Sequence, residues 1–310
     1  MIRKFLFITL FIPLLIVAQS GKSESKIVNF SKKRAVEKIP DLSDKAVKID
    51  TDIPINKKKF SNRIALVIGN ENYSNFQKGG SNIDVVYAKN DAKVFATYCK
   101  KTLGFEEDNV FTLINATSAQ MNSAIVKVKN LMKIIGEDVE VIFYYAGHGL
   151  PDEKEDEAYI IPIDVEGVYL TAAIKLSFLY EQLTANKSKK VTVFLDACFS
   201  GGAREQGLIA ARGIKHTTQS TYMKGNIVVF SASSGTQSAL PWKDKQHGMF
   251  TYYLLKKIKE TKGRLKYGQL DNYVSQNVKL QSWKINNKDQ SPKVLCSPDI
   301  KDKWKLFKMY

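Results

Sequence analysis

The sequence predicts an α/β fold in which a mostly parallel sheet of about six strands carries helices on both faces. Short continuous apolar runs, typical of buried strands, alternate with longer segments whose apolar residues recur at helical spacing. That alternation favours a parallel sheet covered on both sides. The length of 310 residues and the composition, 44% hydrophobic and 25% charged, exclude a wholly disordered or collagen-like chain.

The expected elements of the first half follow one another at short intervals. Residues 63–69 form an apolar run that ends in Gly69, as a buried strand does. Residues 82–103 carry apolar side chains at helical spacing and stop before Gly104. A strand is then expected at 109–114, a helix at 118–135 with Ser118 as its N-cap, and a strand at 139–145.

The second half continues the pattern. Strands are expected at 158–162, 190–195, 227–231 and around Val294, and helices at 177–185, 248–261 and 267–281. We expect ordered structure to begin near Asn62, so that residues 62–310 form one α/β domain.

The amino end has the layout of a secretory signal peptide over residues 1–20. Arg3 and Lys4 precede an apolar run of 14 residues from Phe5 to Ala18, and small residues follow at a candidate cleavage site. The run is short for a membrane span, although an uncleaved anchor stays open. We expect an exported protein, periplasmic or extracellular, whose mature chain has no transmembrane span. Residues 21–61 are polar and lysine-rich and are interpreted as a tether or pro-segment.

The net charge of +16 is spread along the chain. Such charge attracts nucleic acid or anionic membranes without specificity. No run combines Lys or Arg with stacking aromatics, and no nucleic-acid-binding signature is present. We therefore expect a solvated basic surface and no nucleic-acid partner.

Two chemically reactive side chains follow strands of the predicted sheet. His148 stands in Ala-Gly-His-Gly after the strand ending at Tyr145, and Cys198 stands in Asp-Ala-Cys after the strand ending at Leu195. Ligands of such sheets bind beyond the carboxyl ends of the strands. A nucleophilic cysteine needs a basic neighbour, which imidazole supplies. We expect a Cys198–His148 dyad, with the N–H groups of Gly149 and Cys198 as an oxyanion hole.

Each residue alone has a structural interpretation, because a lone cysteine is often a small buried residue and a histidine beside glycines is often a turn residue. Their joint placement favours catalysis. The separation of fifty positions agrees with the spacing of the caspase histidine and cysteine.

The sequence resembles the caspase-like cysteine peptidases, specifically the bacterial metacaspase-like or orthocaspase branch. The resemblance covers about residues 62–300. The landmarks are Ala65–Asn70 with Tyr73, Asn90-Asp91-Ala92, the segments 144–149 and 195–201, Phe230–Ser233 with Gln237–Ala239, Gly248–Thr251, and Gln290-Ser291-Pro292. It implies a three-layer caspase-like sandwich, and it carries the family's catalytic residues over to His148 and Cys198.

The resemblance also implies a specificity. Metacaspases have one acid two residues before the nucleophile and another in the Asn-Asp pair, and both line the S1 pocket; these are Asp196 and Asp91 here. Two carboxylates would favour a protein or peptide substrate with Arg or Lys at P1 and repel Asp. Asp91 could instead be an acid that complements a helix dipole. Phe199 and Ala146 stand where metacaspases usually have His and Ser, which puts fine specificity in doubt.

We expect no required cofactor and no metal site. Many metacaspases respond to calcium, and this chain has an acidic loop (Asp152, Glu153, Glu155, Asp156 and Glu157) with Asp164 and Glu205 as further oxygen donors. The spacing matches no recognised calcium loop, so a solvated loop is the expectation.

Segment 203–224 contains four basic residues at the place where family members have a cleavable loop, which suggests self-processing there or in the lysine-rich tether. Cys99 and Cys296 could pair only if the fold brings them together, and we expect both to be buried and reduced.

The expected protein is thus an exported cysteine endopeptidase that cuts after Arg or Lys. One alternative is a catalytically silent caspase-like module used for binding or signalling. A serine esterase is disfavoured, since the segment at Ser231–Gly235 lacks the leading Gly of a nucleophile elbow.

Overall fold

The computed structural model describes residues 48–77, 83–152, 157–166, 169–199, 223–234 and 237–310. The predicted signal peptide, most of the tether, segment 200–222 and residues 153–156 lie outside this set. The described residues belong to one compact unit that begins at Ala46.

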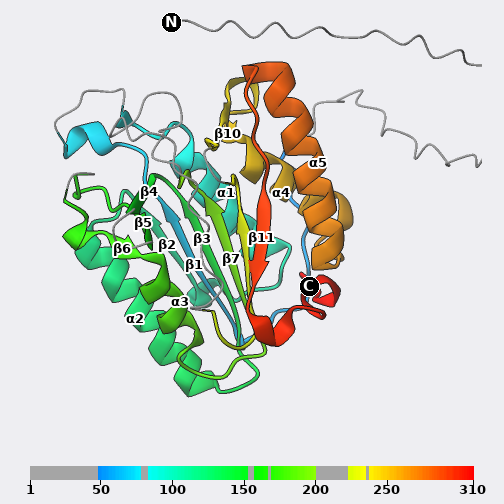
Figure 1. The fold of residues 1–310 in the computed structure, drawn as a ribbon. Coiled ribbons are helices and arrows are strands. Elements are labelled where there is room, and N and C mark those ends of the chain that lie inside the picture. The colour runs from blue at the N-terminus through cyan, green and yellow to red at the C-terminus, as the bar shows by residue number, and fades with distance from the viewer. Residues whose placement is uncertain (1–47, 78–82, 153–156, 167–168, 200–222, 235–236) are drawn as a thin grey trace, which may run out of the picture. The chain divides into compact units, whose positions relative to one another are not determined.

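The central sheet has six strands in the order β11-β8-β7-β3-β1-β2 (Figure 1). Its strands are β1 (Arg63–Gly69), β2 (Val110–Ile114), β3 (Glu140–Ala146), β7 (Lys190–Asp196), β8 (Ile227–Ser231) and β11 (Lys293–Cys296). All neighbouring pairs are parallel except that of β11 with β8. The predicted α/β class and the mostly parallel sheet are confirmed.

Five helices form the outer layers. They are α1 (Ala88–Lys101), α2 (Ser118–Ile135), α3 (Leu176–Thr184), α4 (Met249–Thr261) and α5 (Tyr267–Asn286). Helices α1, α4 and α5 bury apolar side chains against one face of the sheet, and α2 and α3 bury theirs against the other (Figure 1). Strand β1 serves both cores, because Ala65 and Val67 point to the first while Ile64 and Leu66 point to the second. The result is a three-layer sandwich.

Two small sheets lie outside the central one. One contains β4 (Gly149–Asp152), β5 (Glu157–Ile160) and β6 (Ile174–Lys175), and the other contains β9 (Pro241–Trp242) and β10 (His247–Gly248). The strand expected at 158–162 therefore forms, but in an antiparallel side sheet rather than in the central one.

The predicted helix ends differ from the structure at the start of α1, at the N-cap of α2 and at the end of α5, which is Asn286 rather than residue 281. Helix α1 begins at Ala88 rather than at residue 82, because Tyr87 takes a left-handed conformation with φ of 73°. The N-cap of α2 is Thr117 rather than Ser118. Thr117 and Gln120 form a reciprocal capping box, and the Ser118 hydroxyl donates to the Ala172 carbonyl instead.

Packing begins before the predicted domain boundary at residue 62. Ile49 is buried in the core, the Asn56 N–H donates to the Lys101 carbonyl, and the Thr102 hydroxyl donates to the Pro54 carbonyl. Residues 48–61 thus pack on the domain, although they follow a lysine-rich segment without periodicity.

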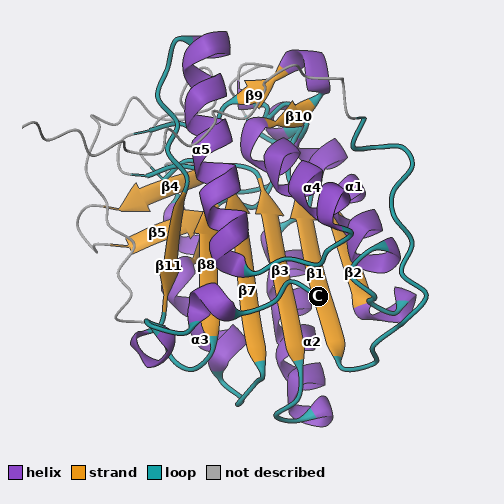
Figure 2. Cartoon of the chain, turned by 90° about the vertical axis from the view of Figure 1, so that its right-hand side faces the viewer, coloured by secondary structure: helices purple, strands orange, loops and turns teal. Residues whose placement is uncertain are grey.

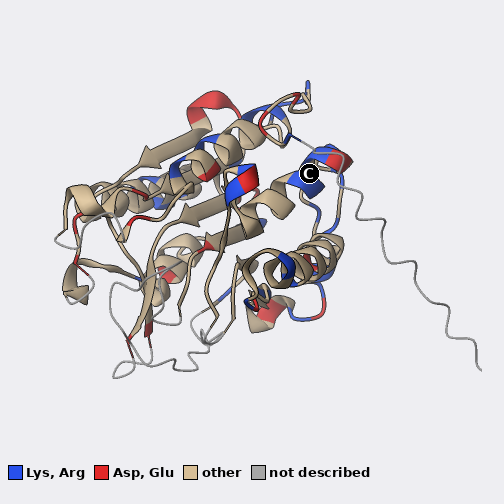
Figure 3. Cartoon of the chain, turned by 90° about the horizontal axis from the view of Figure 1, so that it is seen from above, with Lys and Arg blue, Asp and Glu red and all other residues tan. Residues whose placement is uncertain are grey.

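The charged residues are distributed over many elements. In the view from above, Lys and Arg occupy several helices and loops rather than a single stripe (Figure 3). Among the helices in the described part of the chain, none combines the length and apolar character needed to cross a membrane.

Candidate active site

The candidate dyad residues occupy equivalent positions beyond two adjacent strands. Ala146 at the end of β3 pairs with Asp196 at the end of β7, and His148 and Cys198 each follow two residues later. The Gly147 N–H donates to the Asp196 carbonyl over 3.4 Å. A Cβ atom on Gly149 would lie 2.7 Å from the Cys198 carbonyl oxygen, so the two loops are in direct contact. The site lies at the carboxyl edge of the sheet, toward which the arrows of β1, β3 and β7 point in Figure 2.

The imidazole of His148 has a defined orientation. Its Nε2 lies 2.6 Å from the carbonyl oxygen of Ile83. A carbonyl only accepts, so Nε2 must carry a proton, and Nδ1 is the basic nitrogen of the neutral ring. The Tyr73 ring lies 4.5 Å from the imidazole, between ring centroids. The side chain is thus prepared as a base in one tautomer.

Two tyrosine hydroxyls fix the backbone on both sides of His148. The Tyr73 hydroxyl accepts from the His148 N–H over 3.1 Å and donates to the Ile161 carbonyl over 2.8 Å. The Tyr145 hydroxyl donates to the His148 carbonyl over 2.7 Å and accepts from the Ile161 N–H over 3.2 Å. Tyr145 also lies so close to Gly147 that a Cβ there would clash. This glycine is needed for a close approach.

Cys198 is nearly buried, with 5% of its surface exposed. Its Sγ accepts a hydrogen bond from the Ala239 N–H over 2.7 Å. A backbone N–H directed at sulfur stabilises a thiolate. Gln290 holds the segment that supplies this donor, because its side chain accepts from the Leu240 N–H and donates to the Ala232 carbonyl.

Both acids that the sequence assigns to substrate binding lie at the first turn of α4. The Asp196 Oδ2 accepts from the Thr251 hydroxyl over 2.7 Å and from the Thr251 N–H over 3.3 Å. The Tyr144 hydroxyl lies 2.6 Å from the same Thr251 hydroxyl. The Asp91 Oδ2 accepts from the Gly248 N–H over 3.0 Å. Both carboxylates are fully buried, and the positive end of a helix dipole favours them there.

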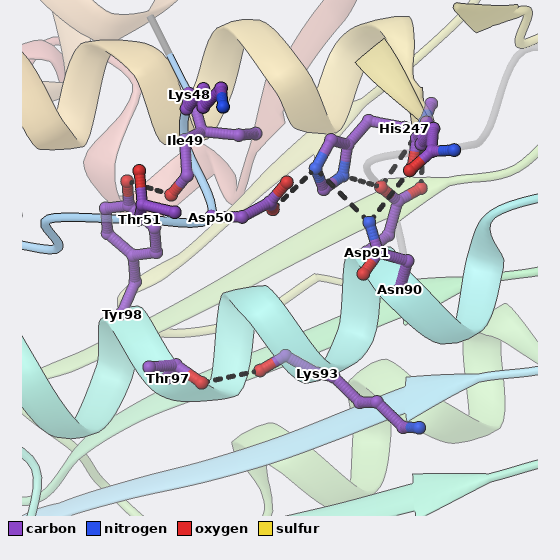
Figure 4. Close-up of polar contacts among 12 residues, drawn as sticks. Lys48, Ile49, Asp50, Thr51, Asn90, Asp91, Lys93, Thr97, Tyr98 and His247 are labelled. Carbon is purple, nitrogen blue, oxygen red and sulfur yellow. Dashed lines mark hydrogen bonds and ion pairs between the residues drawn. The ribbon is translucent and has the colours of Figure 1, made fainter. Parts of the chain in front are cut away.

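Asp91 has a further partner that the sequence did not indicate. The Nδ1 atom of His247 lies 2.6 Å from the Asp91 Oδ1 (Figure 4). The two residues are 156 positions apart, and no motif links them. The alternative considered for Asp91, an acid at the start of α1, also fits its position, since it lies in the first turn of that helix.

Other candidate residues have local structural partners. Phe199 packs against Gly149, where a Cβ would lie 2.6 Å from the ring. In the acidic loop, Glu157 accepts from the Ser177 hydroxyl, and Asp164 accepts from the Ser118 N–H over 2.8 Å. Within the described ranges, no group of three or more His, Cys, Asp or Glu side chains could hold a metal ion.

Cys99 and Cys296 do not form a disulfide with each other. Cys99 is buried and Cys296 is only partly buried, and both are free thiols. Burial raises the pKa of both thiols, which favours their protonated form.

The comparisons with known proteins agree with this geometry. A family model of the caspase domain matches residues 62–302. The chain is 27% identical over 208 residues to a protein described as a paracaspase from Dictyostelium discoideum. The matched segment covers 66% of this chain but only 46% of that relative. The chain thus spans less than half the length of this relative.

Two solved structures are similar to the fold. Protein GSU0716 from Geobacter sulfurreducens matches with a TM-score of 0.55 and 18% identity, covering 79% of this chain and 97% of that one. Caspase-1 from Spodoptera frugiperda matches with a TM-score of 0.49 and 15% identity, covering 80% and 92%.

The chain belongs to the caspase-domain family. The resemblance to the caspase-like family is confirmed, and so is the caspase-like α/β sandwich; the metacaspase-like branch stays a prediction. Membership in this family supports a protease-type function.

Proposed function

We propose that the protein is a cysteine endopeptidase that hydrolyses peptide bonds after Arg or Lys by a Cys198–His148 dyad. The main support for this dyad is the register of β3 and β7, because it puts both residues at equivalent positions beyond adjacent strands. The tautomer imposed on His148 by the Ile83 carbonyl supports the proposal, because it leaves Nδ1 free of a proton in the neutral ring.

The first half of the reaction follows from these groups. His148 Nδ1 takes the proton from the Cys198 Sγ, and the thiolate attacks the carbonyl carbon of the scissile bond. The oxygen of the tetrahedral intermediate becomes negative and accepts hydrogen bonds from the N–H groups of Gly149 and Cys198. Protonated His148 then donates its proton to the leaving amine, the C–N bond breaks, and a thioester to Cys198 remains.

Water completes the cycle. His148 takes a proton from the attacking water, a second oxyanion forms and collapses, and the C–S bond breaks. The released thiolate takes its proton back from His148. The product acid leaves, and the enzyme returns to its starting state.

The P1 preference is proposed from Asp196 and Asp91. Both acids lie at the first turn of α4, on the same side of the sheet as Cys198. Asp196 carries a negative charge when ionised, and two neutral donors, the hydroxyl and the N–H of Thr251, hold its carboxylate. A basic P1 side chain would gain from this charge, and an acidic one would be repelled.

We further propose that the chain is exported after removal of residues 1–20, and that it can process itself at a basic residue in segment 203–224 or in the tether. The test is the Cys198→Ala variant purified alone. If it is still cut at the same sites, self-processing is excluded.

The decisive experiment measures hydrolysis of fluorogenic peptides with Arg, Lys or Asp at P1 by purified residues 21–310, beside Cys198→Ala, with calcium and with chelator. We expect cleavage after Arg and Lys that disappears in the variant. Cleavage after Asp would retain the dyad but exclude the acidic pocket. If the chain with its native Cys198 cleaves none of the peptides, even after limited proteolysis of the 203–224 segment, the endopeptidase is excluded and the silent binding module is favoured.

A further inference from the structure

A buried histidine outside the dyad lies between two carboxylates. The side chain of His247, on β10, is fully buried. Its Nδ1 lies 2.6 Å from the Asp91 Oδ1, and its Nε2 lies 2.9 Å from the Asp50 Oδ1. Figure 4 shows the imidazole between these two acids, which come from α1 and from the segment before β1.

This geometry favours a charged imidazole. A carboxylate oxygen only accepts hydrogen bonds, so His247 can donate to Asp91 and to Asp50 at the same time only when both ring nitrogens carry protons. Burial opposes the charge, but the hydrogen bond and charge of Asp91, together with the charge of Asp50, raise the pKa of His247 above its usual value. A neutral ring with the proton on Nδ1 would lose Asp50, and its Nε2 could instead accept from the Asn90 amide 3.3 Å away.

Asp50 belongs to a short strap, residues 48–51, that is fastened to the domain. Ile49 is buried in the core, and its carbonyl accepts from the Tyr98 hydroxyl over 2.8 Å. The ammonium of Lys259 on α4 donates to the carbonyls of Lys48 and Thr51 over 2.8 and 2.6 Å. The strap therefore holds Asp50 beside His247, although the Asp50 side chain is 47% exposed.

The positive charge of His247 matters more for the ionisation of Asp91 than for that of the exposed Asp50. Asp91 is fully buried, and a buried carboxyl without an opposite charge favours its neutral form. A protonated Asp91 would lose the negative charge that attracts a substrate guanidinium or ammonium. The imidazolium thus keeps the acid ionised and oriented at the start of α4.

We propose that His247 is a positioning residue for the recognition of basic P1 side chains: as an imidazolium joined to Asp50 of the strap, it keeps Asp91 ionised and in place. The inference rests on the proposed function, because it assigns Asp91 to the P1 site. Affinity for Arg or Lys is full while His247 is charged and falls as it loses its proton. Asp50 sets the pH at which this happens.

The test measures peptide affinity directly, in residues 21–310 carrying Cys198→Ala, so that turnover does not intervene. Two labelled peptides differ only in P1, which is Arg or the neutral Gln, and binding is followed by fluorescence anisotropy from pH 5.5 to 9. The variants are Asp50→Asn and His247→Gln. The control is Asp52→Asn, which removes the same charge from an exposed residue two positions away and suits its φ of 49°.

We expect the preference for Arg over Gln to decline at a pH about one unit lower in Asp50→Asn than in Asp52→Asn. His247→Gln should lower the preference roughly tenfold and remove this pH dependence. Thermal midpoints give a readout independent of substrate. The deficit of Asp50→Asn against Asp52→Asn should be full below about pH 6.5, the unfolded value for His, and should vanish as pH rises through the raised folded value.

The outcomes are separable. If the Asp52→Asn chain binds Arg and Gln peptides equally, the basic specificity fails and this inference fails with it. If the Arg preference exists but follows the same pH course in Asp50→Asn, only the role of His247 and the strap is overturned. A shift confined to the thermal midpoint also overturns it, since a merely structural contact would give that result.

Discussion

The two ends of the central sheet use charge in different ways. At the amino end, Arg63, Glu140 and Lys190 are paired in register on β1, β3 and β7, so that one acid lies between two bases. The Glu140 Oε2 lies 3.0 Å from Arg63 and 3.2 Å from Lys190. The Lys190 ammonium also donates to the Lys308 carbonyl over 2.6 Å. All three side chains are buried, and their partners are supplied by the protein itself.

At the carboxyl end, the described partners of the buried acids and of the thiol are neutral groups and one histidine. Asp196 is held only by neutral donors among its described contacts with Thr251, and Cys198 receives a backbone N–H. Asp91 depends on a histidine that is charged over part of the pH range. Groups held in this way can respond to a substrate or to pH.

The difference indicates a division of labour along the same strands. A buried ion cluster whose charges are paired within the protein contributes to stability, whereas acids at the site-bearing end of the strands can select a substrate by charge. Substitutions at the two ends of the strands test this division.

Replacing the thiol should separate activity from stability at the carboxyl end. In Cys198→Ala, we expect kcat/KM on arginine peptides to fall by at least about 10³-fold, because no other group supplies the nucleophile. The thermal midpoint should change little. Parallel kinetics and calorimetry provide the check, and retention of more than a tenth of the activity would exclude Cys198 as the nucleophile.

Neutralising the acid at the amino end should have the opposite effect. Glu140→Gln leaves Arg63 and Lys190 buried together without their counter-charge and should cost about 3 to 5 kcal/mol of unfolding free energy. KM of the folded fraction should stay unchanged. Urea unfolding at pH 7 measures the loss, and a changed KM with normal stability would contradict the division.

The same acid predicts a pH dependence. Burial alone would raise the pKa of Glu140, but Lys190, Arg63 and Lys189 lower it below its usual value. Its contribution is therefore present above the unfolded value of about 4.3 and is lost as pH falls through the lower folded value. The stability gap between the native chain and Glu140→Gln should narrow on acidification below about pH 4.3.

A smaller effect is expected at Thr251. Thr251→Val removes the hydroxyl that donates to Asp196 and should raise KM for arginine peptides roughly threefold to tenfold, with kcat nearly constant. The matched control is Thr261→Val, since that hydroxyl bonds only within the same helix, to the Lys257 and Ile258 carbonyls among its described contacts. Equal KM values for the two variants would show that Thr251 does not act through Asp196.

The smallest effect concerns an exposed ion pair near the amino end. Glu137 lies 3.4 Å from Lys187, and their side chains are 76% and 83% exposed. Glu137→Gln should leave the thermal midpoint unchanged within error, because solvent screens such pairs. A loss comparable to that of Glu140→Gln would show that burial is not what distinguishes the cluster.

Sequence reasoning succeeded where the signal was local and repeated. The strands around 63–69 and 190–196 are continuous apolar runs, and the helix at 118–135 has a clear period and matching ends. His148 and Cys198 could be placed at one edge because parallel strands share their direction. Whether they act as a dyad remains a prediction.

The features that the sequence did not indicate depend on contacts between distant residues, which have no local pattern. Residues 149–152 and 174–175 form a side sheet through pairings across loops, and each strand is too short to show a period. The grouping of Asp50, Asp91 and His247 joins residues separated by up to 197 positions. An isolated His before a helix and an acid in a lysine-rich stretch match no motif. The position of His247 directly before the Gly248–Thr251 landmark was the one available hint.

The strap also matters for where the protein can be cut. Similarity to the caspase domain begins at residue 62, which would be a natural starting point for a recombinant fragment. Such a fragment would lose Ile49 from the core and Asp50 from His247. It would expose apolar surface where Ile49 packs and would alter the acid-base behaviour of His247. The compact unit therefore begins well before the first residue that matches the caspase-domain family.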